Sequence, residues 1–201
     1  MIPVKPQPEP QNFTQCVKTP GIEFLKHIPK PTLKQWNGHE YWRRVLPDMR
    51  KAYKGICAYS AQWISDNGSD SIDHFLSKSS QPNLAYEWGN FRYASLKFNS
   101  RKGIHVILDP FTLAPDWFIL EFPSLLLKPN AGLSAKDKSA VQHTIDVLRL
   151  NDEDCIDSRR SWLEHFYLGQ FPFAHLQDMM PFIAYELQRQ DMVEKIAYIM
   201  T

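Results

Sequence analysis

A histidine beside an aspartate, with asparagines further along, is the group of residues in this sequence best suited to hydrolytic chemistry. It lies at residues 71–103, where His74 is the only histidine and is followed by Asn90 and Asn99. An imidazole titrates near neutrality, which suits a general base that deprotonates water. Asp73 and Asn99 supply a carboxylate and an amide oxygen, which hard cations prefer as ligands. Adjacent strand residues point to opposite sides, so one of the Asp-His pair can face a metal and the other the attacking water. A base and a cation are what hydrolysis of a phosphodiester needs.

The elements around this group are expected to form a hairpin and a helix. GICAYSAQWI at 55–64 reads as a strand, DNGSD at 66–70 contains an Asn-Gly turn signal, and SIDHF at 71–75 reads as a second strand. A polar loop leads to Asn90, and FRYASLKFNSRK then gives a short strand and helical turns that Gly103 ends. Two strands and a helix make a ββα unit.

The rest of the chain is expected to be mainly helical. Helices are predicted at 38–54 (kinked or divided at Pro47), at 136–150 and at roughly 157–168, 175–189 and 191–199, and strands at 104–111 and 116–122. Ser134 is placed as a helix N-cap, and Val141, Ile145 and Leu148 form a buried stripe. We therefore expect an α+β fold in three parts: a Pro-rich extended segment 1–37, a core 38–122 and a helical region 123–201.

The composition indicates a globular protein of a reducing compartment. Of the 201 residues, 43% are hydrophobic, and the three cysteines Cys16, Cys57 and Cys155 lie too far apart for a disulfide framework. The residues after Met1 lack the apolar core of a signal peptide. The most apolar stretch, at 117–127, is short and is broken by a glutamate and a proline. A soluble cytoplasmic protein without membrane contact is expected.

The charge is distributed unevenly, although the net charge of the chain is only +1. Residues 1–54 carry a net charge of +6, residues 55–103 of +1, and residues 104–201 of −6. A polyanion would be attracted to the first half and repelled by the second. The alternative is that both halves are simply solvated surfaces.

The segment that holds the Asp-His pair resembles the HNH endonuclease motif. DHF at 73–75 is followed by NLAYEWGN and FNSRKG, and NFRYASLKFNSRKG from Asn90 aligns without a gap with the common ending N-L-x-L-L-C-x-x-C-H-x-x-K-G. CAYS at 57–60 takes the place of the first CxxC of many members. LAYEWGN and NSRKG look especially like the HNH proteins of Septu-type anti-phage systems, which are often encoded beside an ATPase. The resemblance implies a ββα-metal core with an N-terminal helix and a C-terminal helical region.

The resemblance also implies a role for each matching residue. It makes Asp73 a metal ligand, His74 the general base and Asn99 the second metal ligand. Asn90 matches the middle asparagine, whose part in catalysis is geometric, since it fastens the loop through side-chain to backbone hydrogen bonds. Capping of the helix end is the alternative role for Asn99.

Two departures from the motif change the expected metal. Ser60, Ser95 and Phe98 replace three of the four knuckle cysteines and leave only Cys57, so no structural zinc is expected. Phe98 suggests that apolar packing holds the helix to the hairpin instead. The final histidine of the motif is Asn99 here, so Mg²⁺ or Mn²⁺ is expected rather than Zn²⁺ or Ni²⁺.

The substrate is expected to be DNA. Arg101 and Lys102 are expected to contact phosphates from the last helical turn, and the alternative is that they only complement the helix dipole. RNA remains open as a substrate, because such a motif contacts phosphates rather than base edges.

The resemblance implies a partner as well. The nuclease would be the effector of a defence complex with an ATPase, and the acidic C-terminal region, with apolar helices such as PFIAYEL, would dock this partner or a second copy of the chain. A different class of protein stays open, namely a catalytically silent binding or regulatory subunit that keeps the ββα scaffold. The missing cysteines favour that alternative, and the presence of Asp73, His74 and Asn99 opposes it.

Overall fold

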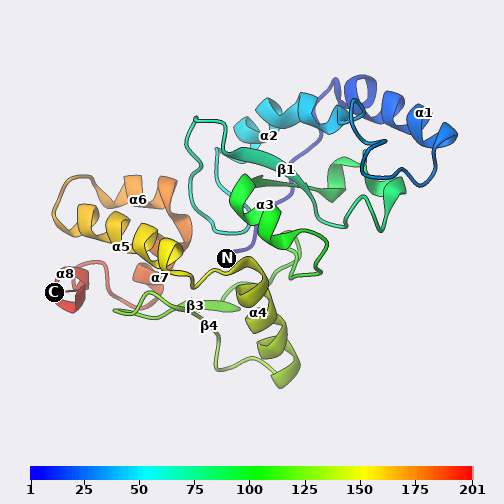
Figure 1. Cartoon of the computed structure of the whole chain (residues 1–201). Helices are drawn as coiled ribbons and strands as arrows, with labels where there is room; N and C mark the ends of the chain where they lie inside the picture. The colour runs from blue at the N-terminus through cyan, green and yellow to red at the C-terminus, as the bar shows by residue number, and fades with distance from the viewer. Residues whose placement is uncertain (201) are drawn as a thin grey trace. The chain divides into compact units, whose positions relative to one another are not determined.

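The computed structural model of the chain describes residues 1–200, which fold into helices and two small antiparallel sheets (Figure 1). The expected α+β class is confirmed. The chain divides into two compact units. We call residues 5–57 with 64–106 the motif unit, and residues 1–4, 58–63 and 107–201 the C-terminal unit. This division differs from the three parts expected from the sequence.

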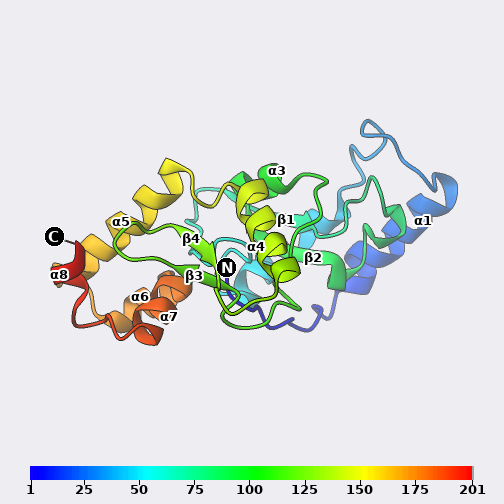
Figure 2. The same ribbon diagram turned by 90° about the horizontal axis from the view of Figure 1, so that it is seen from below.

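The centre of the motif unit is a pair of strands followed directly by a helix. Strand β1 (Asp70–His74) pairs antiparallel with β2 (Phe91–Ser95), with His74 opposite Phe91. Helix α3 (Leu96–Lys102) lies against both strands (Figures 1 and 2). The Ser95 side chain caps its first turn, and Gly103 ends it with a φ of 51°.

Helices precede the hairpin in the motif unit. A π-helical turn (Thr14–Lys18) runs into α1 (Thr19–His27), and a 3-10 helix (Tyr41–Val45) runs into α2 (Leu46–Ala52). The expectation that 1–37 is extended is therefore wrong for the π-helical turn and α1. Val17 and Phe24 are buried on one face of these helices, and this burial stabilises them. The expected division of the 38–54 helix is confirmed, since Pro47 lies in the first turn of α2, where it needs no hydrogen-bond partner.

Two expected strands are absent from the described residues. Residues 55–64 form turns, and Ala61 has a left-handed φ of 52° that interrupts an extended chain. The partner of β1 is therefore β2, and the residues between them form a long loop with 3-10 turns at Pro82–Leu84 and Trp88–Asn90. Residues 104–111 form no strand either. Ile104 and Val106 are 73% and 74% exposed, so no sheet face buries them.

The C-terminal unit contains the second sheet and α4. Strand β3 (Phe118–Leu120) pairs antiparallel with β4 (Leu127–Pro129), and α4 (Ala135–Leu148) packs against β4. The strand expected at 116–122 is confirmed over residues 118–120, whereas β4 was not predicted. The predicted cap is confirmed, because the Ser134 hydroxyl accepts from the Asp137 amide at 3.1 Å. The predicted stripe at Val141, Ile145 and Leu148 is buried.

Four further helices complete the C-terminal unit, namely α5 (Glu153–Tyr167), α6 (Phe173–Met179), α7 (Pro181–Arg189) and α8 (Ile196–Met200). Helices α6 and α7 pack against each other, as Figure 2 shows. Phe182, Ile183 and Leu187 of PFIAYEL are buried within the chain, whereas Tyr185 of the same segment is exposed. Within residues 1–200, no helix combines the length and apolarity needed to cross a membrane.

Candidate active site

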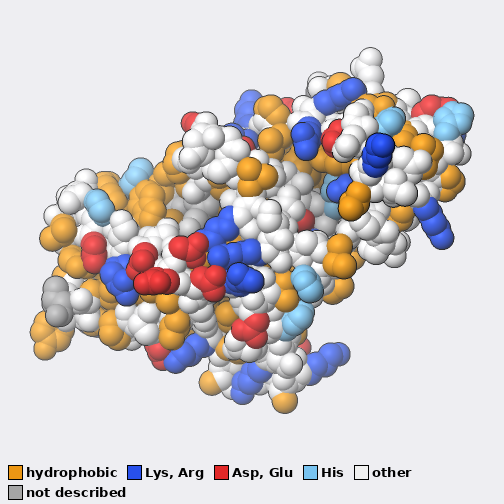
Figure 3. All heavy atoms as spheres, viewed as in Figure 1, with side chains coloured by type: hydrophobic (Ala, Val, Ile, Leu, Met, Phe, Trp, Pro, Cys, Tyr) orange, Lys and Arg blue, Asp and Glu red, His pale blue; other side chains and the backbone are white. Residues whose placement is uncertain are grey.

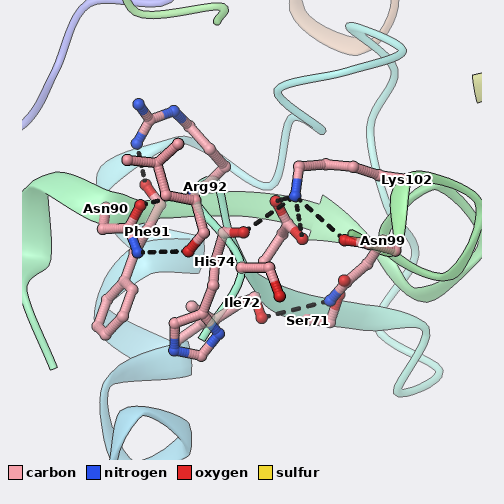
Figure 4. Close-up of polar contacts among 12 residues, drawn as sticks. Ser71, Ile72, His74, Asn90, Phe91, Arg92, Asn99 and Lys102 are labelled. Carbon is pink, nitrogen blue, oxygen red and sulfur yellow. Dashed lines mark hydrogen bonds and ion pairs between the residues drawn. The ribbon is translucent and has the colours of Figure 1, made fainter. Parts of the chain in front are cut away.

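A pocket of about 650 Å³ in the motif unit brings together three of the predicted site residues. Asp73 and His74 line it from the end of β1, and Asn99 lines it from α3. Figure 4 shows His74 and Asn99 approaching from these two elements. Asp73 and Asn99, 26 positions apart in the sequence, therefore line one pocket, because α3 packs against β1.

His74 is held in a defined orientation and tautomer. Its Nε2 lies 2.9 Å from the carbonyl oxygen of Ala85. A carbonyl oxygen only accepts hydrogen bonds, so Nε2 carries the hydrogen and Nδ1 keeps its lone pair. The rings of Trp42 and Phe91 meet the imidazole edge-on, with centroids at 4.6 and 5.3 Å. The imidazole is fixed on two sides with Nδ1 unprotonated.

Burial keeps the His74 imidazole neutral. The side chain is buried, and this burial lowers its pKa from 6.5 to about 3, with nearby Lys78 and Lys102 acting in the same direction. The hydrogen bond to Ala85 opposes this effect but is smaller. At neutral pH the imidazole is therefore in its unprotonated form, which can accept a proton.

Asp73 forms an ion pair with Lys102 inside the protein. The ammonium nitrogen of Lys102 lies 3.1 Å from Oδ2 and 3.3 Å from Oδ1 of Asp73. It also lies 2.9 Å from the carbonyl oxygen of His74 (Figure 4). The side chains of Lys102 and Asp73 are 0% and 3% exposed. The ammonium group thus neutralises the carboxylate and joins the end of α3 to the end of β1.

The burial of Lys102 corrects its expected role. A fully buried ammonium group that bonds Asp73 and the backbone cannot contact phosphates from the helix surface. Arg101 packs over the ring of Phe98, with 5.8 Å from Cζ to the centroid. Neither cation lines the pocket. The expectation that both bind phosphates is therefore not supported by their positions.

Asn99 presents its amide with a defined orientation. Its Nδ2 donates to Ser71 Oγ at 3.1 Å and to the carbonyl oxygen of Ile72 at 3.3 Å. Because both hydrogen bonds use the nitrogen, the Oδ1 oxygen remains available as an acceptor or a metal ligand. Asn99 also provides the carbonyl that accepts from the Gly103 amide at the helix end, but through its backbone rather than its side chain.

Asn90 fastens the loop between β1 and β2. Its Oδ1 accepts from the Leu76 amide at 2.8 Å, and its Nδ2 donates to the carbonyl oxygens of Leu76 and Leu84 at 3.0 and 3.1 Å. One buried amide thereby satisfies three backbone groups of the loop. This is the geometric role that the resemblance implies. Asn90 does not line the pocket.

The pocket offers oxygen ligands for a cation. Among residues 1–200 no three histidine, cysteine, aspartate or glutamate side chains gather as a metal site. Asp73 and Asn99 offer one carboxylate and one amide oxygen to the same pocket. Mg²⁺ is commonly held by one or two protein ligands while it keeps several waters, so this donor set fits it better than it fits Zn²⁺. The ammonium group of Lys102 weakens the attraction of Asp73 for any cation.

Residues that stand in place of the knuckle cysteines have structural roles in this protein. The Ser95 hydroxyl accepts from the Phe98 amide at 3.4 Å and so caps α3. Phe98 is buried beneath that helix, which agrees with apolar packing between helix and hairpin. Cys57 is a buried free cysteine.

Sequence reasoning missed two cations that line the pocket. Lys78 comes from the loop after β1 and Arg43 from the 3-10 helix before α2. Neither residue belongs to a motif with a recognisable spacing, because the two come to the pocket from distant parts of the sequence only when the chain folds. The basic stretch WRR at 42–44, within the helix predicted at 38–54, is the one weak signal for Arg43.

The charge asymmetry follows the two units. The motif unit carries 15 Lys and Arg against 8 Asp and Glu, a net charge of +7, whereas the C-terminal unit carries −6. In Figure 3, acidic side chains gather around α5, whose first turn contains Glu153 and Asp154. A polyanion is therefore attracted to the unit that contains the pocket.

Comparison of the chain with protein-family models gave no match, and comparison with curated proteins gave no significant match.

Proposed function

We propose that the motif unit is an HNH-type nuclease domain with a ββα-metal core, which hydrolyses phosphodiester bonds of DNA with Mg²⁺ or Mn²⁺. The observation that carries this proposal is the orientation of His74. Its Nε2 is bonded to Ala85 and its unprotonated Nδ1 belongs to a ring that lines the same pocket as Asp73 and Asn99.

The reaction assigned to the pocket is an in-line hydrolysis. Nδ1 of His74 takes a proton from a water molecule, the water oxygen forms a bond to phosphorus, and the bond from phosphorus to the 3′ oxygen breaks. The departing 3′ oxygen takes a proton from a solvent water, which leaves a 3′ hydroxyl and a 5′ phosphate. Asp73 and Asn99 would hold the cation, which when bound neutralises charge on the phosphate and the departing oxygen. Asn90 positions the loop that carries Ala85, so it acts through His74 and is a positioning residue.

The net charge of +7 on the motif unit supports a nucleic acid as substrate. Duplex DNA is our first choice because of the resemblance to HNH endonucleases. RNA is the alternative, since a pocket that contacts phosphates has no means of its own to reject it.

The resemblance to HNH effectors of anti-phage systems leads to a proposed partner. The acidic C-terminal unit, which repels nucleic acid, would bind an ATPase partner or a second copy of the chain. The docking face would have to differ from the buried residues of α7. Co-purification from the native operon tests this part, and a monomer with no bound ATPase would contradict it.

A catalytically silent binding subunit is a second candidate, and the Asp73–Lys102 ion pair favours it. An ammonium group at 3.1 Å from the carboxylate already supplies the positive charge that a metal would bring. Such a protein would bind nucleic acid or a partner without cleaving either.

Two measurements on the purified protein separate these candidates. Plasmid DNA and total RNA are incubated with the protein in Mg²⁺, in Mn²⁺ and in EDTA, with and without the neighbouring gene product. Metal-dependent cleavage of DNA supports the proposal, whereas cleavage of RNA alone changes the substrate. If neither is cut and calorimetry detects no Mn²⁺ binding, the silent subunit is the better description.

A further inference from the structure

We infer that Lys78 and Arg43 form an anion site in the pocket beside His74, and that its ligand is a phosphate of the DNA backbone. This inference deepens the proposed function and depends on it for the identity of the ligand. Phosphate contact, the role expected of Arg101 and Lys102, is thereby assigned to two residues that belong to no sequence motif.

Lys78 is a cation without a counter-ion. No carboxylate among residues 1–200 lies within ion-pair distance of its ammonium group, although the side chain is half-buried. This burial lowers the pKa of Lys78 despite the charges of Asp73 and Glu40, which act in the opposite direction. A partly desolvated ammonium group that lacks an acceptor is stabilised when an anion reaches it.

The indole rings around Lys78 hold its ammonium group in place. The nitrogen lies 5.4 Å from the ring centroid of Trp42 and 6.0 Å from that of Trp36. Trp42 also contacts the His74 imidazole edge-on at 4.6 Å. One ring therefore fixes both the cation and the proposed base, so Trp42 is a positioning residue for the site.

Arg43 adds a second positive charge to the same pocket. It lines the pocket from the 3-10 helix, and its side chain is exposed and forms no ion pair with any residue among 1–200. The positive charge of Arg43 lowers the pKa of Lys78, so the two cations repel each other. An anion between them would relieve this repulsion, which is a reason for the site to be filled.

The chemistry of the lining favours a phosphate over a carboxylate. Ser77 and Ser79 line the pocket beside Lys78 and can donate hydroxyl hydrogen bonds, so the lining offers guanidinium, ammonium and hydroxyl donors together. A phosphodiester offers acceptor oxygens in several directions, which a planar carboxylate does not. With about 650 Å³ the pocket exceeds a single ion and accepts the adjoining sugar as well.

The test measures binding of a short duplex DNA in EDTA, where no cleavage interferes, over a series of salt concentrations. Loss of one phosphate contact reduces the slope of log K against log salt by about 0.9. We expect Lys78→Met to weaken binding and reduce the slope by this amount, and Lys78→Arg to restore both. Lys51→Met is the matched control, because it removes an exposed lysine of α2 that does not line the pocket.

Two further arms keep the test decisive. Arg43→Gln alters an exposed side chain, so it should fold and reduce the slope even if Lys78→Met proves unstable. Equal slopes for Lys78→Met, Arg43→Gln and Lys51→Met would overturn the inference, and it would do so even if the protein cuts DNA. A Lys78-dependent slope in a protein that cleaves nothing with any metal would support the anion site and contradict the nuclease.

Discussion

The ammonium group of Lys102 lies 3.1 Å from the carboxylate of Asp73, and both side chains are buried at the junction of α3 and β1. The pair neutralises the carboxylate that is proposed to hold a metal. The Lys102 ammonium group also donates a hydrogen bond to the His74 carbonyl, so it fixes the backbone that carries the proposed base. One ion pair thereby joins α3 to β1 and positions both the proposed metal ligand and the proposed base.

Removal of this ammonium group should destabilise the motif unit strongly. Lys102→Met removes the ammonium group that pairs with a buried carboxylate, which costs about 3–5 kcal/mol of the free energy of unfolding. Urea denaturation measures the loss. Lys51→Met serves as the control, and a surface change of this kind should stay within about 0.5 kcal/mol. Equal stability of the two variants would show that the pair is not formed in solution.

The stability should fall in acid because of His74. Its folded pKa of about 3 lies below the unfolded value of 6.5, so the unfolded chain takes up the proton first as the pH falls. The part of the free energy of unfolding that depends on neutral His74 is fully present above about pH 6.5 and is lost progressively toward about pH 3. At about pH 5 the loss is about 2 kcal/mol. His74→Gln removes this part of the pH dependence, and denaturant unfolding of both proteins at several pH values measures the difference. Parallel curves for the two would contradict the burial of a neutral imidazole.

The loop between β1 and β2 should loosen without the Asn90 side chain. Asn90→Ala removes three side-chain hydrogen bonds to the loop backbone, and the carbonyl and amide of Leu76 lose their side-chain partner, at a cost of about 2–3 kcal/mol. Hydrogen exchange at the Leu76 amide should become faster. Asn83→Ala removes an exposed amide from the same loop and should change neither quantity. Unchanged exchange in Asn90→Ala would refute the fastening role.

The metal preference should depend on Asn99. Asn99→Ala removes one of the two proposed oxygen ligands, so the calorimetric signal of Mg²⁺ or Mn²⁺ should weaken or vanish. Asn99→His places an imidazole there, and imidazole ligands favour Ni²⁺ and Zn²⁺. A shift of preference toward these metals supports the site. Unchanged Mn²⁺ binding in both variants would place the metal elsewhere.

Local patterns predicted several elements correctly. The stripe of Val141, Ile145 and Leu148 and its Ser134 cap define α4, because each contact lies within one helix or its first turn. The strand at 71–75 was also expected, and β1 covers most of it. What failed was the pairing of that strand, since 55–64 is apolar but turns. Pairing depends on contacts between distant residues, which a local pattern does not contain.

The site was predicted in part for the same reason. The gathering of Asp73, His74 and Asn99 in one pocket matches the motif. The burial of Lys102 was missed because its place at a helix end suggested exposure. Phe98 lies four residues earlier on the same helix face and is also buried, and this spacing could have indicated it.

Nicking of supercoiled plasmid DNA by the purified protein in Mg²⁺ tests the central claim most directly, with His74→Ala compared with wild type and with His105→Ala. His105 is an exposed histidine outside the pocket, so its loss should leave the rate unchanged. We predict that the wild type nicks the plasmid and that His74→Ala, folded by circular dichroism, is slower by about 10²–10⁴-fold. Equal nicking by a folded His74→Ala variant would contradict the account.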